Sequence, residues 1–286
     1  MKRRRIETLI LALVALAAIV IAAGCSNPTG LSPSELSSDT QDGNTATPDG
    51  VASDESQNLE AELSLDSNIT ADSPATVTGD TAWVTGVSGD AMEFDQDGEF
   101  ISLPDSDSLD LSADATVEAW IYPHPGVQAA AGILHKGAAP DFSDEAYSLQ
   151  YNNVNSSGDG QVAFIITNDA GTHTYVISSE YVLHNSQWNH IVVAWDTTDV
   201  YLYVNGVLLT DRQIYQNGWK TSIPAGFAPA RNSDGALLIG SQLPEPNSIN
   251  SDGYYGFNGI IDEVALYSRI LDASEVEDHY NALAPL

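Results

Sequence analysis

The sequence is almost without cysteine, because Cys25 is the only one in 286 residues. A single thiol cannot form an intramolecular disulfide, so an exported form of the chain would depend on its hydrophobic core for stability. One thiol also cannot supply the set of thiolates on which Cys-rich structural zinc sites are built.

Basic residues are also scarce. Nine Lys and Arg stand against 40 Asp and Glu, which gives a formal net charge of −31. A surface this acidic repels phosphate groups, so the composition excludes nucleic acid as a partner. Two explanations of the acidity stay open: a high-salt habitat, in which ions screen the self-repulsion, or a general need for solubility outside the cell.

Many of the cations are concentrated at the N-terminus. Residues 2–5 are one Lys and three Arg, and an uncharged apolar run over residues 9–23 follows them and ends in small residues before Cys25. A positive flank, a short apolar core and a small-residue end are typical of a secretory signal. An uncleaved membrane-spanning helix is the alternative, but the run is shorter than the roughly 20 residues that a span needs.

The end of this run carries a resemblance of its own. Residues 21–25, IAAGC, resemble the lipobox of prokaryotic lipoproteins, with Ala22 where Leu is more usual. The resemblance implies that residues 1–24 are a signal peptide and that the Cys25 thiol carries lipid, which leaves no cysteine nucleophile. It also implies an extracytoplasmic, surface-exposed protein, lipid-anchored to the cell membrane or the outer membrane.

The composition changes after Cys25. Residues 26–76 contain ten acidic residues, no Lys or Arg, and no aromatic residue. Such a segment cannot bury enough apolar area to offset its chain entropy, so we predict an acidic, disordered stalk over residues 25–76. Residues 59–65 (LEAELSL) are compatible with a short helical turn or with a first strand, and this alternative stays open.

From residue 77 to residue 286 the pattern is that of one all-β domain. Short runs of β-branched and aromatic residues recur between Gly, Asn, Asp and Pro. Asn205-Gly206, between two such runs, predicts a two-residue hairpin turn. Near the end, Asp272 and Glu275 form a capping box that predicts a helix. Its apolar stripe would be Leu271, Val276, Tyr280 and Leu283. Many strands and one terminal helix predict two sheets packed as a sandwich or jelly roll.

The same segments resemble, in order, those of laminin-G-like, concanavalin A-like lectin/glucanase jelly-roll domains. The matching segments are residues 91–95 with 100–104, 115–123, 132–137, 147–149, 188–193, 202–206, 238–240 and 257–264. The first two look like an opening hairpin, and residues 267–280 look like the closing strand and helix. The resemblance implies an all-β, two-sheet antiparallel jelly-roll sandwich over residues 77–286 with a short C-terminal helix. The long loops 211–234 and 244–255 depart from the pattern, and loops carry specificity, so no ligand is implied.

Catalysis is a question because this fold also occurs in endoglucanases. Retaining glycosidases need two carboxylates about 5–5.5 Å apart. Glu93 and Glu99 superficially offer such a pair, but the family's motif has a closer spacing, and Gly98 indicates a turn between them. No Ser-His-Asp arrangement is evident among the six His. We therefore expect a domain that is not an enzyme, with a glycoside hydrolase or lyase as the alternative.

Relatives of this fold often carry a structural calcium ion. Asp262 matches the closing position of their site, and Asp95 or Asp97 could join it, with backbone carbonyls as further ligands. The alternative is a solvated turn in an acidic protein. The resemblance thus implies possible structural Ca²⁺ at Asp95, Asp97 and Asp262. The histidines that we expect to be packed or at strand ends instead are His124, His135 and His190.

Aromatic residues in loops are the remaining signal, because sugar-binding modules stack aromatic faces on their ligands. We predict ligand contacts for Trp219, Tyr215, Tyr254 and Tyr255, although such residues can equally fold down over the end of a sandwich. The tryptophans in apolar runs, which are expected in the core, are Trp120, Trp188 and Trp195. For Lys136 and Arg231 the ordinary expectation is a surface ion pair.

The sequence therefore predicts a lipid-anchored, non-catalytic surface protein, monomeric, that binds an extracellular glycan. The alternative is an adhesion or structural protein that binds a surface protein and no sugar.

Overall fold

The part of the chain that the computed structural model describes lies within Asn58–Leu286. The described residues are 59–63, for which only the backbone is considered, 75–95, 98–111, 113–127, 129–137, 139, 141–153, 158–228, 230–243 and 255–285. Residues 1–24, for which we expect a signal peptide, and the predicted site residues Cys25, Asp97 and Tyr254 lie outside them. Among the described residues, no helix combines the length and apolar character that a membrane span requires.

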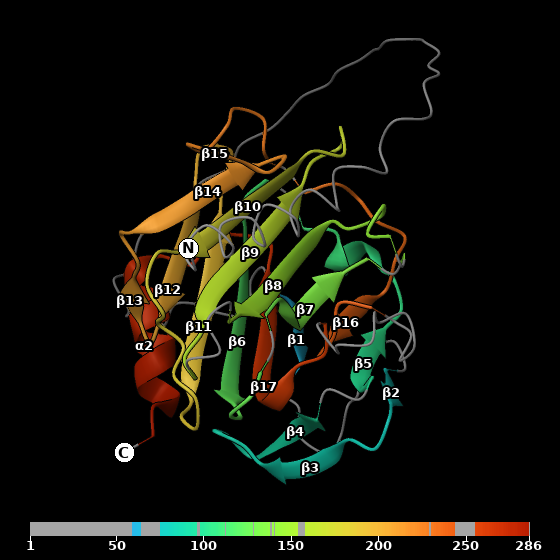
Figure 1. Cartoon of the computed structure of the whole chain (residues 1–286), viewed down its shortest axis with the longest axis vertical. Coiled ribbons are helices and arrows are strands. Elements are labelled where there is room, and N and C mark those ends of the chain that lie inside the picture. Colours follow the sequence, from blue (N-terminus) through green and yellow to red (C-terminus); the bar gives the residue numbers. More distant parts are fainter. Residues whose placement is uncertain are drawn as a thin grey trace, which may run out of the picture. The chain divides into compact units, whose positions relative to one another are not determined.

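Two antiparallel sheets form the domain (Figure 1). The nine-stranded sheet has the order β15 (Trp219–Thr221), β14 (Arg212–Gln216), β10 (His173–Ser178), β9 (Gln161–Thr167), β8 (Tyr147–Asn152), β7 (Ala131–Lys136), β16 (Leu237–Ile239), β5 (Phe100–Leu103) and β2 (Thr76–Thr78). The eight-stranded sheet has the order β13 (Val207–Leu208), β12 (Val200–Val204), β11 (Asn189–Trp195), β6 (Ala115–Pro123), β17 (Asn258–Tyr267), β4 (Asp90–Asp95) and β3 (Ala82–Thr85), with β1 (Leu59–Leu63) also paired to β17. The predicted sandwich is confirmed.

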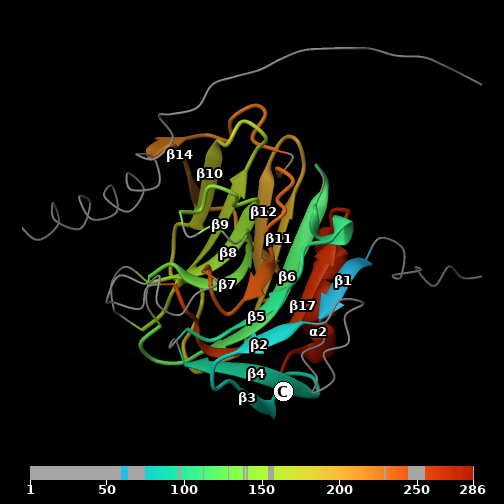
Figure 2. The same ribbon diagram turned by 90° about the vertical axis from the view of Figure 1, so that its right-hand side faces the viewer.

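The main core is formed by buried side chains from the strands of both sheets, which lie face to face in the turned view (Figure 2). Alternate residues of each strand point into it, because successive side chains of a strand face opposite ways. Trp195 of β11 is fully buried and reaches Phe164 and Tyr147 of the nine-stranded sheet, with ring centroids 5.2 and 6.1 Å away. Burial of each such side chain stabilises the fold by about 2–3 kcal/mol. Trp195 is therefore a core residue, as predicted.

The predicted opening hairpin is wrong. β4 pairs with β3 and β17 in the eight-stranded sheet, whereas β5 pairs with β2 and β16 in the nine-stranded sheet. The connection thus crosses from one sheet to the other, and Gly98 with φ of 81° lies in it. The hairpin at Asn205-Gly206 is confirmed: β12 pairs with β13, and the two turn residues have φ of 51° and 76°.

Strand β17 has two partners on one edge. β4 pairs with its first half, over Asn258 to Ile261, and β1 pairs with its second half, over Val264 to Tyr267. A bulge separates the halves on the β6 side, between Asp262 and Ala265. β1 lies within the range that we assigned to the stalk, so the structure selects the strand rather than the helical turn for this segment.

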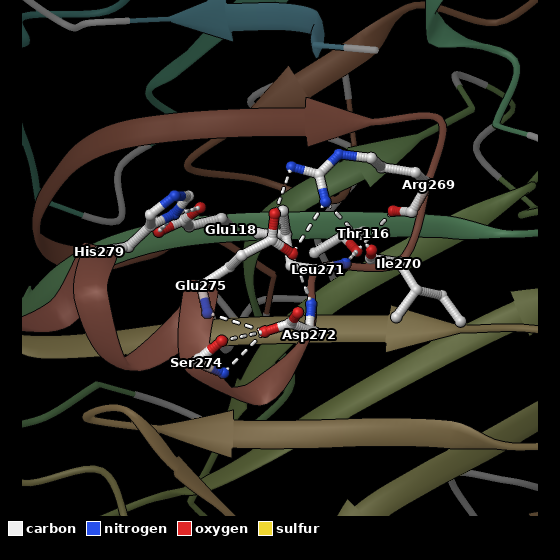
Figure 3. A network of polar contacts seen from close by, with 9 residues as sticks. All are labelled: Thr116, Glu118, Arg269, Ile270, Leu271, Asp272, Ser274, Glu275 and His279. Carbon is white, nitrogen blue, oxygen red and sulfur yellow. Dashed lines mark hydrogen bonds and ion pairs between the residues drawn. The ribbon is translucent and has the colours of Figure 1, made fainter. Parts of the chain in front are cut away.

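The C-terminal helix α2 (Ala273–Leu283) begins with the predicted capping box. Asp272 accepts hydrogen bonds from the N–H groups of Ser274 and Glu275, and Glu275 accepts one from the N–H of Asp272 (Figure 3). Arg269 also pairs with Glu275 at 2.9 Å. Of the predicted apolar stripe, Leu271 and Val276 are buried on the outer face of the eight-stranded sheet.

Trp120 is buried beneath α2 rather than between the sheets. Its ring stacks on those of His190 and Tyr280, with centroids 4.8 and 5.7 Å away. Trp188 is only half-buried, at the end of the domain where it meets Tyr122 edge-on. The expected burial is thus confirmed for Trp120 and Trp195 and is wrong for Trp188.

Lys136 is fully buried, so the expected surface ion pair is wrong. Its ammonium group donates to a carboxylate oxygen of Asp105 and to the carbonyl oxygens of Ser233 and Gly235, the last two at 2.5 and 2.7 Å. A second carboxylate, that of Asp110, lies 3.7 Å away. The lysine thus ties the loop before β16 to the short helix Asp107–Leu109.

Candidate functional site

The two described carboxylates of the expected calcium site lie at separate places along β17. Asp95 is opposite Asn258, whereas Asp262 lies four residues farther along the strand. Four residues of extended strand span about 13 Å, so the backbone does not bring these side chains together. Among the described residues, no group of three or more His, Cys, Asp and Glu side chains is arranged to hold a metal ion.

Asp262 holds a backbone turn. The carboxylate is fully buried, and one of its oxygens accepts hydrogen bonds from the N–H groups of Val87 and Ser88 at 2.8 and 3.2 Å. The other oxygen accepts from the N–H of Glu263 at 2.9 Å. A Cβ on Gly86 would collide with this carboxylate. Three N–H donors thus compensate the charge of Asp262, and they hold the turn between β3 and β4.

The two carboxylates of the superficial catalytic pair have different surroundings. Glu93 lies on β4, half-exposed, with its carboxylate 3.6 Å from the ring of His124. Glu99 lies just before β5 and is buried, and its carboxylate accepts the N–H of Asp95 at 2.7 Å. Burial raises the pKa of Glu99. The buried carboxylate closes the connection between the sheets, where it contacts backbone rather than a substrate groove.

The predicted loop aromatics are part of a hairpin that extends the nine-stranded sheet. β14 and β15 pair around the turn Asn217-Gly218, with Tyr215 opposite Lys220 and Gln216 opposite Trp219. Directly opposed residues share a sheet face, and neighbours along a strand do not. Tyr215 and Trp219 therefore emerge on opposite faces of the hairpin, so the structure divides the set that the sequence grouped.

Tyr215 lies on the outer face of the nine-stranded sheet beside a residue that the sequence reasoning missed. Tyr175 of β10 is opposite Tyr215, and the ring centroids are 6.3 Å apart. The next pair, Val176 and Ile214, points into the core, which fixes the outward direction of the tyrosines. The β-rich run over residues 173–178 was the available signal, because it marks a strand, but only the pairing with β14 identifies the partner of Tyr175.

Gln213 and Lys220 complete this outer surface. The side-chain oxygen of Gln213 accepts the hydroxyl of Tyr215 at 2.8 Å and the ammonium of Lys220 at 3.4 Å. Burial raises the pKa of both Tyr175 and Tyr215, so their hydroxyls remain protonated at neutral pH. We call Tyr175, Gln213, Tyr215 and Lys220 the tyrosine patch.

Tyr255 lies elsewhere on the nine-stranded sheet. Its carbonyl oxygen accepts the N–H of Gly132 at 3.0 Å, and its ring meets that of Phe142 edge-on, with centroids 5.5 Å apart. Phe142 in turn covers His135, which is fully buried. Tyr255 thus belongs to a packed cluster at β7 and not to the tyrosine patch, and the buried histidine agrees with the expectation of a packed residue.

A buried polar group lies beneath this cluster. One oxygen of the Glu145 carboxylate is 3.5 Å from His135, and the other is 3.1 Å from His173, which also contacts the hydroxyl of Thr167 at 2.9 Å. Burial lowers the pKa of His135. The side chains of His135 and Glu145 are closed off from solvent, so this cluster is less suited than the tyrosine patch to meet a large ligand.

A family model decides the affiliation of the domain. The model described as "Concanavalin A-like lectin/glucanases superfamily" matches residues 95–277. The chain belongs to this superfamily. A comparison with curated protein sequences finds no match.

Three solved structures are similar in fold to this chain. Domain 4 of AbnA, a GH43 extracellular arabinanase from Geobacillus stearothermophilus, solved in complex with arabinotriose, has a TM-score of 0.53 and 21% identity over 80% of this chain and 98% of that domain. The binding domain of Paraclostridial Mosquitocidal Protein 1 has a TM-score of 0.57 and 17% identity, over 79% of this chain and 52% of that one. The binding domain of botulinum neurotoxin serotype G has a TM-score of 0.55 and 14% identity, over 79% and 51%. This chain spans about half the length of the two toxin binding domains, and at these identities the likeness concerns the fold.

Proposed function

We propose that this protein is a non-catalytic, lipid-anchored surface protein that binds an extracellular carbohydrate, and that the tyrosine patch is the contact surface. One observation carries the proposal: two half-buried tyrosine rings lie 6.3 Å apart on an outward sheet face beside an exposed ammonium group. Aromatic rings supply apolar contact area with a polar tip, which suits the apolar face and hydroxyl edge of a sugar.

The comparisons support a binding role. Domain 4 of the arabinanase was solved with an arabinotriose, and the toxin structures are described as binding domains. The burial of Glu99 and its hydrogen bond from the N–H of Asp95 support a protein without hydrolase activity, since that chemistry needs two carboxylates that both reach the substrate.

A protein partner is the second candidate, and the edge strands favour it. Val207 on β13 is 64% exposed, and Trp219 on β15 is 75% exposed. Both strands are outermost in their sheets, and an unpaired strand edge with apolar side chains can accept another chain.

A binding experiment separates these candidates. The full chain would be presented to an array of neutral and acidic polysaccharides, and positive glycans would be measured by calorimetry. We expect Tyr215→Ala to reduce affinity at least fivefold and Val207→Ala, a truncation on the other sheet, to leave it unchanged. An array without any signal, combined with a captured surface protein whose binding Val207→Ala weakens, would replace the glycan proposal with the protein-partner one.

Two parts of the proposal need separate measurements. Cys25→Ser should release the protein from the membrane fraction and abolish incorporation of labelled fatty acid, because the thiol is the proposed attachment point. If the protein binds structural Ca²⁺, the ion should raise the melting temperature in a concentration-dependent way, and equal melting temperatures in calcium and in chelator would show that it does not stabilise the fold.

A further inference from the structure

The two sheets differ sharply in their acidic residues. Within the strand bounds given above, the eight-stranded sheet contains eight Asp and Glu, and the nine-stranded sheet contains none. The whole chain has 40 acidic residues. The strands of the nine-stranded sheet therefore place no carboxylate on its outer face, so within this face an approaching anion meets no acidic strand residue.

The same sheet holds most of the cations of the domain. After Cys25 the chain has five Lys and Arg, and three of them, Lys136, Arg212 and Lys220, lie on strands of the nine-stranded sheet. Lys136 is buried on carboxylate and carbonyl oxygens, and Arg212 pairs with Asp199 at 2.6 Å. Lys220 is different, because its ammonium is exposed and its described contact is the neutral oxygen of Gln213.

The tyrosine patch presents donors outward and keeps its acceptor occupied. A lysine ammonium only donates, so the Gln213 atom that faces it is the amide oxygen, and that oxygen also receives the Tyr215 hydroxyl. The amide nitrogen of Gln213 therefore points its N–H groups away from these contacts. The Gln213 amide nitrogen and the Lys220 ammonium together offer several N–H donors to a ligand. The Gln213 amide oxygen already accepts two hydrogen bonds from within the tyrosine patch.

We propose that the tyrosine patch selects an anionic saccharide, one whose sugar units carry carboxylate or sulfate groups. This inference rests on the proposed carbohydrate function and names its ligand class. The tyrosine rings contact the apolar sugar face, and the Lys220 ammonium and the Gln213 amide donate to the anionic oxygens. The acid-free sheet lets the anion approach a protein whose remaining surface repels it.

The test compares three oligosaccharide probes of equal length on the full chain: an oligogalacturonate, a sulfated galactan fragment and an unsubstituted galactan fragment. We expect at least one anionic probe to bind more tightly than the neutral one at low salt. Lys220→Gln should lower that affinity about two- to fivefold, in the range of an exposed charged contact, and should flatten its salt dependence. The matched control is Thr85→Glu, which makes the same change in net charge at an exposed position on β3.

The outcomes distinguish the anionic ligand class from carbohydrate binding as such. Preference for the oligogalacturonate identifies the carboxylate as the recognised group, and preference for the galactan sulfate identifies the sulfate. Either result supports the inference if Lys220→Gln removes the preference and Thr85→Glu does not. Equal or tighter binding of the neutral probe overturns the anionic class and leaves carbohydrate binding intact. If Lys220→Gln and Thr85→Glu lower the affinity for the anionic probe equally, Lys220 acts only through the net charge of the protein. The tyrosine patch is then not the site that selects the anion. Binding of none of the probes, with an empty glycan array, overturns both.

Discussion

Glu118 and His190 face each other from adjacent strands β6 and β11, with 2.6 Å between a carboxylate oxygen and the ring Nε2. His279 of helix α2 approaches the other oxygen at 3.0 Å (Figure 3). Glu118 is almost fully buried, on the outer face of the sheet that the helix covers. One carboxylate thus joins two strands and the closing helix, and the two histidines are its described partners.

This arrangement predicts a loss of stability in acid. Burial alone would raise the pKa of Glu118, but the hydrogen bonds and charges of His190 and His279 outweigh it and lower the pKa from 4.5 to about 2. Because the folded pKa is depressed, the contribution is present above pH 4.5 and is lost as the pH falls toward 2. It amounts to the order of 3 kcal/mol. Urea unfolding between pH 5 and pH 2.5 should show a steeper decline in the native protein than in Glu118→Gln.

A variant on the same helix controls for general effects of carboxylate titration. Glu277 is exposed on α2 and has no part in this contact. Glu277→Gln should keep the native pH dependence and change the free energy of unfolding by less than about 0.5 kcal/mol. Parallel pH curves for the native protein and Glu118→Gln would remove Glu118 as the source of acid sensitivity.

Lys136 supplies a second prediction, because its charge is buried among oxygens. Lys136→Met removes the cation and leaves the carboxylates of Asp105 and Asp110 and two carbonyl groups without it. Breaking a buried ion pair costs about 3–5 kcal/mol, which corresponds to a drop in melting temperature of roughly 10 °C in a domain of this size. Calorimetry would measure it. Lys220→Met, the same substitution at an exposed site, should leave the melting temperature almost unchanged.

The parts of the fold that the sequence predicts are those whose contacts are local. Local signals were sufficient where the contacts are local: Asn205-Gly206 determines its own turn, and Asp272 caps its own helix. The predicted hairpin of β4 and β5 is wrong because a turn signal shows only that the chain changes direction. It does not show which sheet the next strand joins. The burial of Lys136 could not be predicted because its two carbonyl partners lie almost a hundred residues away in sequence.

At the site, the sequence identified Tyr215 but not its neighbours. Its ring partner Tyr175 lies forty residues earlier, and the pairing of β10 with β14 is a long-range contact that no local pattern encodes. Trp219 drew attention because it is aromatic in a loop, yet the register of a three-residue strand turns it to the opposite face. A shift of one residue reverses every side chain of a strand, so single-residue site predictions in short strands depend on a register that the sequence does not determine.

The contact between Gly86 and the Asp262 carboxylate predicts that substitutions at these two residues have non-additive effects on the free energy of unfolding. Gly86→Ala would place a methyl group against the buried carboxylate, which is itself fixed by N–H groups of Val87, Ser88 and Glu263. Overpacking of this kind costs about 1–3 kcal/mol. In an Asp262→Ala background the clash with the carboxylate is absent and only the close approach to the Cβ of Ala91, at 3.0 Å, remains, so the added cost of Gly86→Ala should fall. A double-mutant cycle measured by urea unfolding tests this, and additive effects would show that the two residues do not interact.

The division of the loop aromatics by the hairpin predicts an order of effects on binding. Tyr215 shares the outward face with Tyr175 and Lys220, whereas Trp219 faces the other way and is 75% exposed. Tyr215→Ala should therefore weaken glycan binding more than Trp219→Ala, and Trp219→Ala should change the free energy of unfolding by less than about 0.5 kcal/mol. Calorimetric titration of both variants with the same oligosaccharide measures the order. The reverse order would place the ligand on the opposite face of the hairpin, where Gln216 lies beside Trp219, and would move the binding surface to the edge of the sandwich.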